Sequence, residues 1–408
     1  MIKGNAIVGQ SGGPTAAINA TLAGVVRGAY ESGCIDKIYG ALNGVAGLLE
    51  DNYCVLNDIL TGENELKLLE NTPAAALGSC RMKLPDPDKD TAPFEKLFEL
   101  FEKLDIKYFF YIGGNDSMDT VDKLSRYAKK ICSDLRVMGV PKTIDNDLCG
   151  TDHTPGFGSA AKFIATVMQE IIRDTAVYTV EAVTIVEIMG RDAGWLTAAS
   201  ALPRKVCGVA PDLVYLPEVV FDYDKFFEDI QKAFEKKPNI VVAVSEGIRL
   251  ADGRYVGEST QSGATDVFGH KYLAGTGKML ENAVKEKLGC KVRSVELNLP
   301  QRCASHIASR CDLEESVSVG RAAVACAVRG ESAKMMCFER EDGEYSVKCI
   351  ARDISEIANK IKYVPREYIT ERGNNVTDEC VDYLLPLING EVSITYKDGL
   401  PVHFVIER

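Results

Sequence analysis

Histidine is scarce in this chain, and its few copies lie far apart. Only four occur in 408 residues, at His153, His270, His306 and His403. The 13 cysteines are scattered along the chain and contain no Cys-x-x-Cys pair. Zinc sites and disulfide frameworks need closely spaced ligands or paired cysteines, so neither is expected here. The pattern favours buried thiols in a reducing compartment, and we predict a cytoplasmic location.

Long apolar runs and an excess of positive charge are also missing. No apolar stretch approaches the roughly 18–20 residues that a transmembrane helix needs, and the first apolar run is too short for a signal peptide. The 47 Lys and Arg against 59 Asp and Glu give a net charge of −12. This balance argues against general binding to nucleic acid or to an anionic membrane. Any anionic substrate must therefore be met by basic residues that are concentrated locally.

Two nucleotide-binding signatures are absent as well. The run Gly-Thr-Gly-Lys-Met at 275–279 lacks both the spacing and the Ser/Thr of a Walker A loop. No Gly-x-Gly-x-x-Gly follows the first expected strand. A nicotinamide-dependent enzyme is therefore not supported.

What the sequence does contain is a regular alternation of strand-like and helix-like segments. Strands are predicted at 6–9, 107–112, 135–140, 182–188, 240–244 and 292–297, with a terminal strand at 402–406. Helices are predicted at 16–32, 117–131, 159–174, 278–288 and 377–388. This rhythm is typical of parallel sheets with helices on both faces. We therefore expect an α/β fold of two doubly wound, Rossmann-like domains that face each other across a cleft.

The segment with the most chemical content is Pro-Lys-Thr-Ile-Asp-Asn-Asp at 141–147, directly after an expected strand. In α/β enzymes the carboxyl end of a strand is where the chemistry is placed. Thr143, Asp145 and Asp147 alternate, so an extended backbone directs all three the same way. Together with Lys142 they can position a phosphate, bind a cation and accept a proton. The simpler interpretation is an acidic turn in which Asp147 caps a loop.

Two glycine-rich turns also follow expected strands. Gly12 and Gly13 precede a predicted helix, where the backbone can approach an anion and helix N–H groups are free to bind it. The second turn, Gly-Gly-Asn-Asp-Ser, adds Asn115 and Ser117, which can bind phosphate or metal-bound water. Asp116 is unusual in such a turn, because a carboxylate repels phosphate.

Each turn has a simpler interpretation. The first is compatible with a tight strand-to-helix connection, and the second with an ordinary helix N-cap. The first turn also matches the Gly-x-Ser-x-Gly elbow of serine hydrolases around Ser11. That match is weak, because no histidine lies in a recognisable catalytic loop.

Polar clusters follow expected strands in the second half of the chain too. They are Met189-Gly190-Arg191, Ser245-Glu246-Gly247, Arg293 and Gln301-Arg302. Arginine suits phosphate, and a carboxylate suits sugar hydroxyls. Each alone is more commonly a surface group, but their shared position at strand ends favours a binding site.

Taken together, GGPTAAIN, GSCR, GGNDS, PKTIDND, MGR, SEG and the R…QR pair resemble the 6-phosphofructokinase family, in that family's order, over roughly residues 4–350. The resemblance implies a two-domain enzyme that phosphorylates the 1-hydroxyl of fructose 6-phosphate. It implies a phosphoryl-donor domain at 1–156 with a return at about 303–360, a fructose 6-phosphate domain at 157–302 and a C-terminal extension at 361–408. Mg²⁺ as cofactor and a homodimer or homotetramer are implied as well.

The resemblance also implies residue roles. Asp145 is the general base, and Asp116 and Lys142 act at the phosphoryl donor. Asn115 stands at the magnesium position, where many relatives have aspartate. Implied substrate-binding residues are Gly12, Gly13, Arg81, Ser117, Thr143, Ile144, Asp145, Met189, Gly190, Arg191, Glu246, Arg293, Gln301 and Arg302.

Asp116 and Lys142 bear on the choice of donor. ATP-dependent members carry glycine at both positions, and Asp with Lys resembles the diphosphate-dependent branch. A carboxylate ~4 Å from an α-phosphate costs on the order of 4 kcal/mol at an effective dielectric near 20. Diphosphate has no α-phosphate and avoids this cost, while Lys142 can neutralise charge on the separating phosphoryl groups.

Three further departures concern regulation and sugar binding. Ala182 stands where bacterial ATP enzymes have an arginine that reaches a neighbouring subunit, and Ala23 where they have an effector-binding arginine. Both predict weak or absent allosteric control by nucleotides. Leu299 replaces a polar residue that often helps to bind the sugar phosphate. Two alternatives stay open, an ATP-dependent phosphofructokinase and a non-catalytic regulatory subunit that only binds sugar phosphate.

Overall fold

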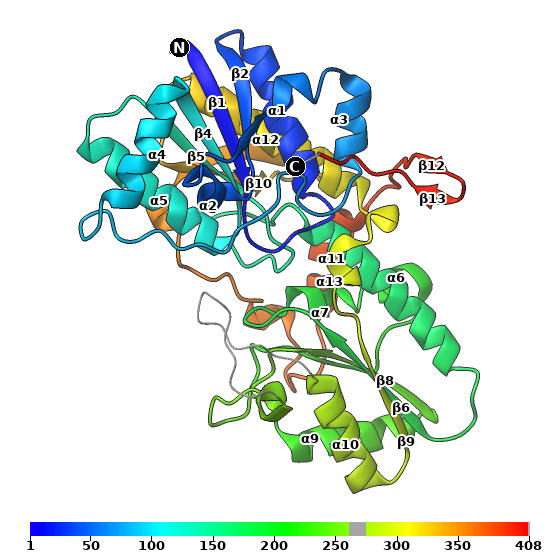
Figure 1. Cartoon of the computed structure of the whole chain (residues 1–408). Helices are drawn as coiled ribbons and strands as arrows, with labels where there is room; N and C mark the ends of the chain where they lie inside the picture. The colour runs from blue at the N-terminus through cyan, green and yellow to red at the C-terminus, as the bar shows by residue number, and fades with distance from the viewer. Residues whose placement is uncertain (261–274, 407–408) are drawn as a thin grey trace.

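The computed structural model describes residues 1–260 and 275–406, which form two lobes that are each built around a sheet (Figure 1). The larger sheet has the strand order β11-β10-β5-β4-β1-β2-β3 and the smaller one β7-β8-β6-β9. The larger sheet comprises β1 (Gly4–Gln10), β2 (Ile35–Ala41), β3 (Tyr53–Val55), β4 (Ile106–Gly113), β5 (Arg136–Pro141), β10 (Lys334–Arg340) and β11 (Val347–Asp353). The smaller sheet comprises β6 (Ala182–Ile188), β7 (Leu213–Tyr215), β8 (Asn239–Ser245) and β9 (Lys291–Glu296), and β12 (Tyr396–Lys397) and β13 (Leu400–Pro401) form a separate hairpin.

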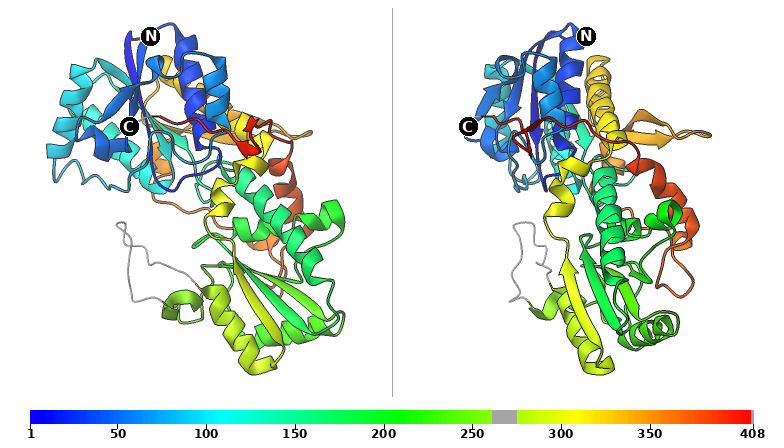
Figure 2. Two further views of the ribbon diagram at one scale, coloured as in Figure 1. Left: turned by 45° about the vertical axis from the view of Figure 1, so that its right-hand side comes forward. Right: turned by 90° about the vertical axis from the view of Figure 1, so that its right-hand side faces the viewer.

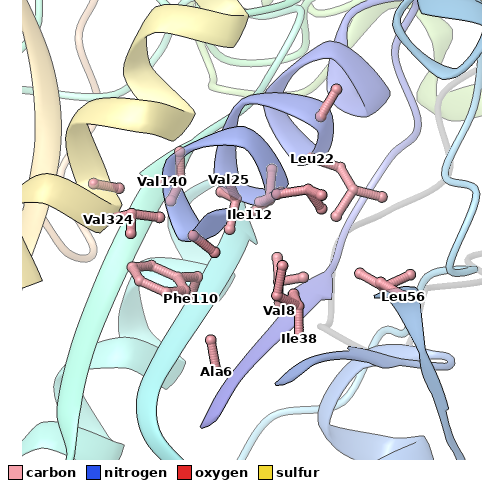
Figure 3. Close-up of a cluster of buried hydrophobic side chains, with 14 of the residues drawn as sticks. Ala6, Val8, Leu22, Val25, Ile38, Leu56, Phe110, Ile112, Val140 and Val324 are labelled. Atoms are coloured by element: carbon pink, nitrogen blue, oxygen red, sulfur yellow. The ribbon is translucent and has the colours of Figure 1, made fainter. Parts of the chain in front are cut away.

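The central strands of the larger sheet run parallel, with antiparallel β3 and β11 at its two edges. Its helices are α1 (Ile18–Ser32), α2 (Gly44–Leu48), α3 (Glu63–Glu70), α4 (Ala92–Lys103), α5 (Asn115–Lys130) and α12 (Arg310–Val328). One core lies under α1 and α12 and another under α4 and α5. Figure 3 shows the first of these, where Leu22 and Val25 of α1 face Val8, Phe110 and Val140 of the sheet.

Helices α1 and α12 lie side by side although they are almost 300 residues apart in the chain (Figure 2). Glycines make the close approach possible. A Cβ on Gly24 would stand 2.2 Å from the carbonyl oxygen of Val317, and one on Gly320 would stand 2.4 Å from that of Thr21. The chain therefore leaves the first domain after β5 and returns to it through α12, β10 and β11.

All strands of the smaller sheet run parallel. The helices around this sheet are α6 (Phe157–Thr175), α7 (Trp195–Ala199), α8 (Pro203–Cys207), α9 (Tyr223–Phe234), α10 (Thr276–Leu288), α11 (Pro300–Cys303) and α13 (Asp378–Leu384). One core joins the sheet to α6, α7 and α13, and the other joins it to α9 and α10. In the described part of the chain, short 3₁₀ helices lie at Leu56–Asp58, Val256–Thr260, Ser305–Ile307, Ile354–Glu356, Arg366–Tyr368 and Leu385–Ile388.

The α/β class is confirmed, and the six internal strands predicted from sequence are present with small shifts at their ends. The predicted terminal strand at 402–406 is wrong. This segment follows β13 without forming a strand: Val402 N–H donates to Thr395 O at 2.8 Å, and Phe404 N–H donates to the side-chain oxygen Thr72 Oγ1 at 2.8 Å and not to a neighbouring strand. The predicted helix at 377–388 is shorter than expected, since α13 ends at Leu384 and a 3₁₀ turn containing Pro386 follows.

The C-terminal residues touch both domains. Val364, Ile369 and Val376 are buried in the core of the second domain, whereas Ile406 is buried in that of the first. Within the described ranges, no helix has the length and apolar character that crossing a membrane requires.

Candidate active site

The polar loops of the two domains extend from strand ends that face each other. The carboxyl ends of β1, β4 and β5 are aligned at one edge of the larger sheet. Those of β6, β8 and β9 are aligned at one edge of the smaller sheet. The Asp145 carboxyl, after β5, is close enough to Glu246, after β8, for the Glu246 charge to raise the Asp145 pKa. The two edges therefore form one site.

The first glycine turn lies beside two cations. Gly12 has a φ of +77°, a left-handed conformation that glycine adopts without strain. A Cβ on Gly12 would stand 3.4 Å from Lys142 Nζ, and one on Gly13 would stand 3.3 Å from Arg302 Nη1. The Gly12 N–H donates to Cys80 O at 3.3 Å, which brings the neighbouring Arg81 to the same turn. This backbone segment is therefore surrounded by positive charge.

The second turn connects β4 to α5. A Cβ on Gly113 would stand 1.9 Å from Ser117 Oγ, so the turn needs glycine to close over this buried serine. Asn115 is the first residue of α5, and Asp116 follows in the first turn. Asp116 Oδ1 forms an ion pair with Lys83 Nζ at 3.4 Å. Sequence reasoning missed this lysine.

The loop after β5 only partly follows the predicted alternation. Thr143 Oγ1 donates to Asp145 Oδ2 at 3.4 Å and accepts from the Asp145 N–H at 3.1 Å, so these two side chains share one side. Asn146 then has a φ of +53°, which ends the extended geometry. Asp147 consequently turns toward α5, where Asn115 Nδ2 donates to its Oδ2 at 3.5 Å. The extended backbone on which the predicted alternation depends therefore ends at Asn146, although Asp147 stays close enough to Asp145 for that carboxylate to add to the effect of burial in raising the pKa of Asp147.

Lys142 lies beneath the first turn. It is 2% exposed, and its Nζ donates to Gly13 O at 2.5 Å. Burial lowers the pKa of Lys142 to about 8, against the opposing influence of the Asp145 carboxylate. This cation thus lies between the turn that can hold a phosphate and the residue that can take a proton.

The Asp145 carboxyl has the electrostatics of a base that works near neutrality. Burial and, to a smaller extent, the nearby Glu246 carboxylate raise its pKa to about 6 against the opposing influence of Lys142 and Arg191. Burial likewise raises the pKa of Glu246 to about 7. A carboxylate whose pKa lies just below the working pH is ionised and still basic enough to accept a proton.

The loops of the second domain hold one another in place. Gly190 N–H donates to Glu246 Oε1 at 3.2 Å, and Met189 N–H donates to Gln301 Oε1 at 3.2 Å. Gly247 must be glycine, because a Cβ there would stand 1.8 Å from Arg191 O. The Nε of Arg191 is buried and has no hydrogen-bond partner among the described residues. This guanidinium is available to an anionic ligand.

Arg302 is close to several of these groups at once. It lies in the last turn of α11, faces the turn at Gly13, and is near Asp145 and Arg81. Burial lowers its pKa, and the neighbouring Arg81 lowers it further. Two guanidiniums that repel each other in a partly buried site are best stabilised by an anion between them.

Two predicted residues do not join this group. Arg293 lies within β9 opposite Thr184, not after the strand, and is exposed at the sheet edge beside a small hollow that Asp174 also lines. The Ile144 side chain is buried in the core of the second domain. Ser11 Oγ donates to Cys80 O at 3.4 Å, so its hydroxyl is bonded to the backbone and not to a catalytic histidine.

A carboxylate base, a buried lysine, two glycine turns and converging arginines define the class of site that transfers a phosphoryl group to a hydroxyl. Comparison with known proteins gives the family. The family description "Phosphofructokinase" matches residues 5–327. The chain belongs to the phosphofructokinase family.

Similar proteins support this assignment along the whole chain. Pyrophosphate–fructose 6-phosphate 1-phosphotransferase of Halomonas elongata is 40% identical over 98% of this chain and 96% of the relative. The enzyme with the same name from Xanthomonas campestris is 40% identical over 100% of this chain and 97% of its own. The crystal structure of pyrophosphate-dependent phosphofructokinase from Nitrosospira multiformis is 38% identical, with a TM-score of 0.88, covering 98% of this chain and 95% of that one.

Proposed function

We propose that the chain transfers a phosphoryl group from diphosphate to the 1-hydroxyl of fructose 6-phosphate, giving fructose 1,6-bisphosphate and phosphate. Diphosphate and the product bisphosphate have comparable transfer potential, so the reaction runs in both directions and serves glycolysis and gluconeogenesis. The observation that carries the choice of donor is the pair Asp116 and Lys142 at the two glycine turns.

The donor binds to the first-domain turns in this proposal. Gly12, Gly13 and Ser117 belong to the turns that approach the diphosphate, and Arg81 supplies a further positive charge. Lys142 stabilises the charge that develops on the transferring group. Asp116 excludes the α-phosphate of a nucleotide by charge and by volume.

The sugar phosphate binds opposite the donor. Glu246 accepts from sugar hydroxyls, while Arg191 and Arg302 hold the 6-phosphate through charge-assisted hydrogen bonds. Thr143 donates to the carboxylate of Asp145, and that carboxylate takes the 1-hydroxyl proton as the hydroxyl oxygen attacks. Since Arg302 also faces the donor turn, its positive charge can attract both the 6-phosphate and the diphosphate. A role for Arg293 in binding the 6-phosphate requires a second subunit, because this side chain is remote from the site of its own chain.

The residues around Asn115 suit a magnesium ion. Asn115 Oδ1 and Asp147 Oδ1 are both buried, and neither has a hydrogen-bond partner in the described part of the chain. Amide and carboxylate oxygens are the ligands that Mg²⁺ prefers, usually with phosphate oxygens and water completing its shell. When bound there, the ion neutralises charge on the diphosphate. Asn115 and Asp147 would hold it.

Comparing donors tests the proposal. The purified chain is assayed with fructose 6-phosphate, Mg²⁺ and either diphosphate or ATP, and fructose 1,6-bisphosphate is measured. Turnover with diphosphate that exceeds turnover with ATP by at least tenfold is expected. Preference for ATP would establish the ATP-dependent alternative, and lack of turnover with both donors would favour the regulatory subunit.

Three broader features belong to the same proposal. The enzyme works in the cytoplasm, it forms a homodimer or homotetramer, and nucleotides exert little allosteric control over it. Ala23 and Ala182 support the last feature, because neither can bind an anionic effector. Light scattering gives the oligomeric state, and assays with added ADP show whether nucleotides change the rate.

A further inference from the structure

The loop after β5 is held by a lysine that lies more than 200 residues further along the chain. Lys362 Nζ donates to Asn146 Oδ1 at 3.0 Å, to Thr151 O at 3.3 Å and to Asp152 O at 2.6 Å. These bonds use all three donors of the ammonium group. The backbone N–H of Lys362 donates to Asp147 O at 2.8 Å.

The loop needs such an anchor at this point. Asn146 separates Asp145 from Asp147 and adopts a left-handed conformation that is unfavourable for most residues other than glycine, although asparagine visits it more readily than others. Its side chain is completely buried. The turn at Asn146 sets the direction of both neighbouring carboxylates. A bond that fixes the Asn146 side chain therefore fixes the direction of the proposed base.

Lys362 is in turn anchored to the second domain. Its carbonyl oxygen accepts from Trp195 Nε1 at 3.0 Å, and its ammonium lies 5.2 Å from the centroid of that ring. Two residues on, Val364 N–H donates to Glu218 Oε1 at 2.9 Å, and the Val364 side chain is buried in the second-domain core. The segment thus connects the loop that carries the base to the domain that carries the sugar-binding loops.

We propose that Lys362 is a positioning residue for phosphoryl transfer, which holds Asp145 at the correct place relative to the second domain. The inference rests on the proposed function, because it takes Asp145 to be the base. Lys362 bonds to the loop backbone and to Asn146, not to Asp145 itself, and acts only through the loop. Its loss should therefore lower kcat and leave the KM for fructose 6-phosphate almost unchanged, since Arg191, Glu246 and Arg302 are held by other contacts.

The test compares Lys362→Ala with two controls on the same segment. A displacement of about 1 Å between reacting groups can cost about 10²-fold in rate, and a loss of that order in kcat is expected for Lys362→Ala. Propylammonium replaces the missing side-chain atoms and should raise the kcat of Lys362→Ala at least tenfold. Lys360→Met removes an exposed positive charge nearby and should leave kcat unchanged. Trp195→Phe removes the bond to Lys362 O but keeps the three ammonium bonds and the second-domain anchor between Val364 N–H and Glu218, so it should lower the Tm with little change in kcat.

Steady-state kinetics are measured on each variant at a temperature where circular dichroism shows it to be folded. A kcat for Lys362→Ala within threefold of the parent overturns the inference. Equal losses of kcat in Lys362→Ala and Trp195→Phe for an equal drop in Tm also overturn it, because the lysine would then act only on stability. The same holds for a loss of kcat that propylammonium does not reverse. Failure of the parent chain to turn over diphosphate or ATP contradicts the proposed function itself, and with it this inference.

Discussion

Replacing Lys142 by methionine removes one positive charge from the donor turns and keeps most of the side-chain volume. The ammonium is almost completely buried, donates to Gly13 O and lies 3.4 Å from the position of a Cβ on Gly12. A donor phosphate bound on that turn comes within a few ångströms of it. The charge is also fixed before the reaction, so it needs no rearrangement as negative charge develops.

The size of the effect follows from this geometry. Two unit charges ~4 Å apart interact by about 4 kcal/mol at an effective dielectric near 20. Removing one fixed donor to a developing charge costs about 2.7–4 kcal/mol in enzymes where it has been measured. Because about 1.4 kcal/mol corresponds to a factor of ten, kcat with diphosphate should fall by about 10²–10³. The KM for fructose 6-phosphate should change by less than about threefold.

The assay follows fructose 1,6-bisphosphate formation while diphosphate and fructose 6-phosphate are varied separately. Lys83→Met is the matched control, since it removes a half-exposed lysine that pairs with Asp116 at 3.4 Å and should alter kcat by less than about fivefold. A Lys142→Met variant that keeps kcat and only raises the KM for diphosphate would refute the reasoning, because the charge would then act equally in the ground state and the transition state.

Three other substitutions test separate parts of the molecule. Asp145→Asn keeps the shape of the base and removes its basicity, so kcat should fall by about 10²–10⁴ with the fold intact by circular dichroism; near-normal kcat would reassign the base. Asp116→Gly removes the carboxylate that repels an α-phosphate, so inhibition by ATP competitive with diphosphate should become measurable; unchanged weak ATP binding would show that another feature excludes the nucleotide. Burial raises the pKa of Glu187 from 4.5 to about 7. The free energy of unfolding therefore falls as the pH rises from about 4.5 to about 7, and the whole of this loss is present above pH 7. Glu187→Gln should therefore raise the free energy of unfolding by about 3 kcal/mol near pH 8 and hardly change it near pH 4.5, as measured by urea unfolding.

The fold could be predicted where strands are buried on both faces. Segments such as Tyr108–Ile112 of β4 are continuous apolar runs, because helices cover the sheet on each side. Strands near the edges of a sheet lack such a continuous apolar run. β11 has an exposed lysine followed by four partly buried residues, with no regular alternation, and was missed. The segment 402–406 has the apolar pattern of a strand, but its Phe404 N–H bonds to the Thr72 side chain and not to a neighbouring strand, and only tertiary structure decides that.

The site could be predicted at strand ends but not across the chain. The loops with Asp145, Gly190 and Glu246 each follow a strand, so their convergence follows from the parallel sheets. Lys362 has no local motif and reaches its loop only because residues 361–388 pack into the second domain. The direction of Asp147 depends on one left-handed residue, which the alternating sequence does not show.

The proposed base, Asp145, is influenced by residues of both domains. Burial is the largest influence on its pKa. Lys142 of the first domain and Arg191 of the second stabilise its charge, whereas Glu246 of the second opposes it. If the domains separated, the Asp145 carboxyl would lose the influence of both Glu246 and Arg191. In the proposed mechanism, the basicity of Asp145 is therefore tied to the same arrangement of domains that brings fructose 6-phosphate to the donor.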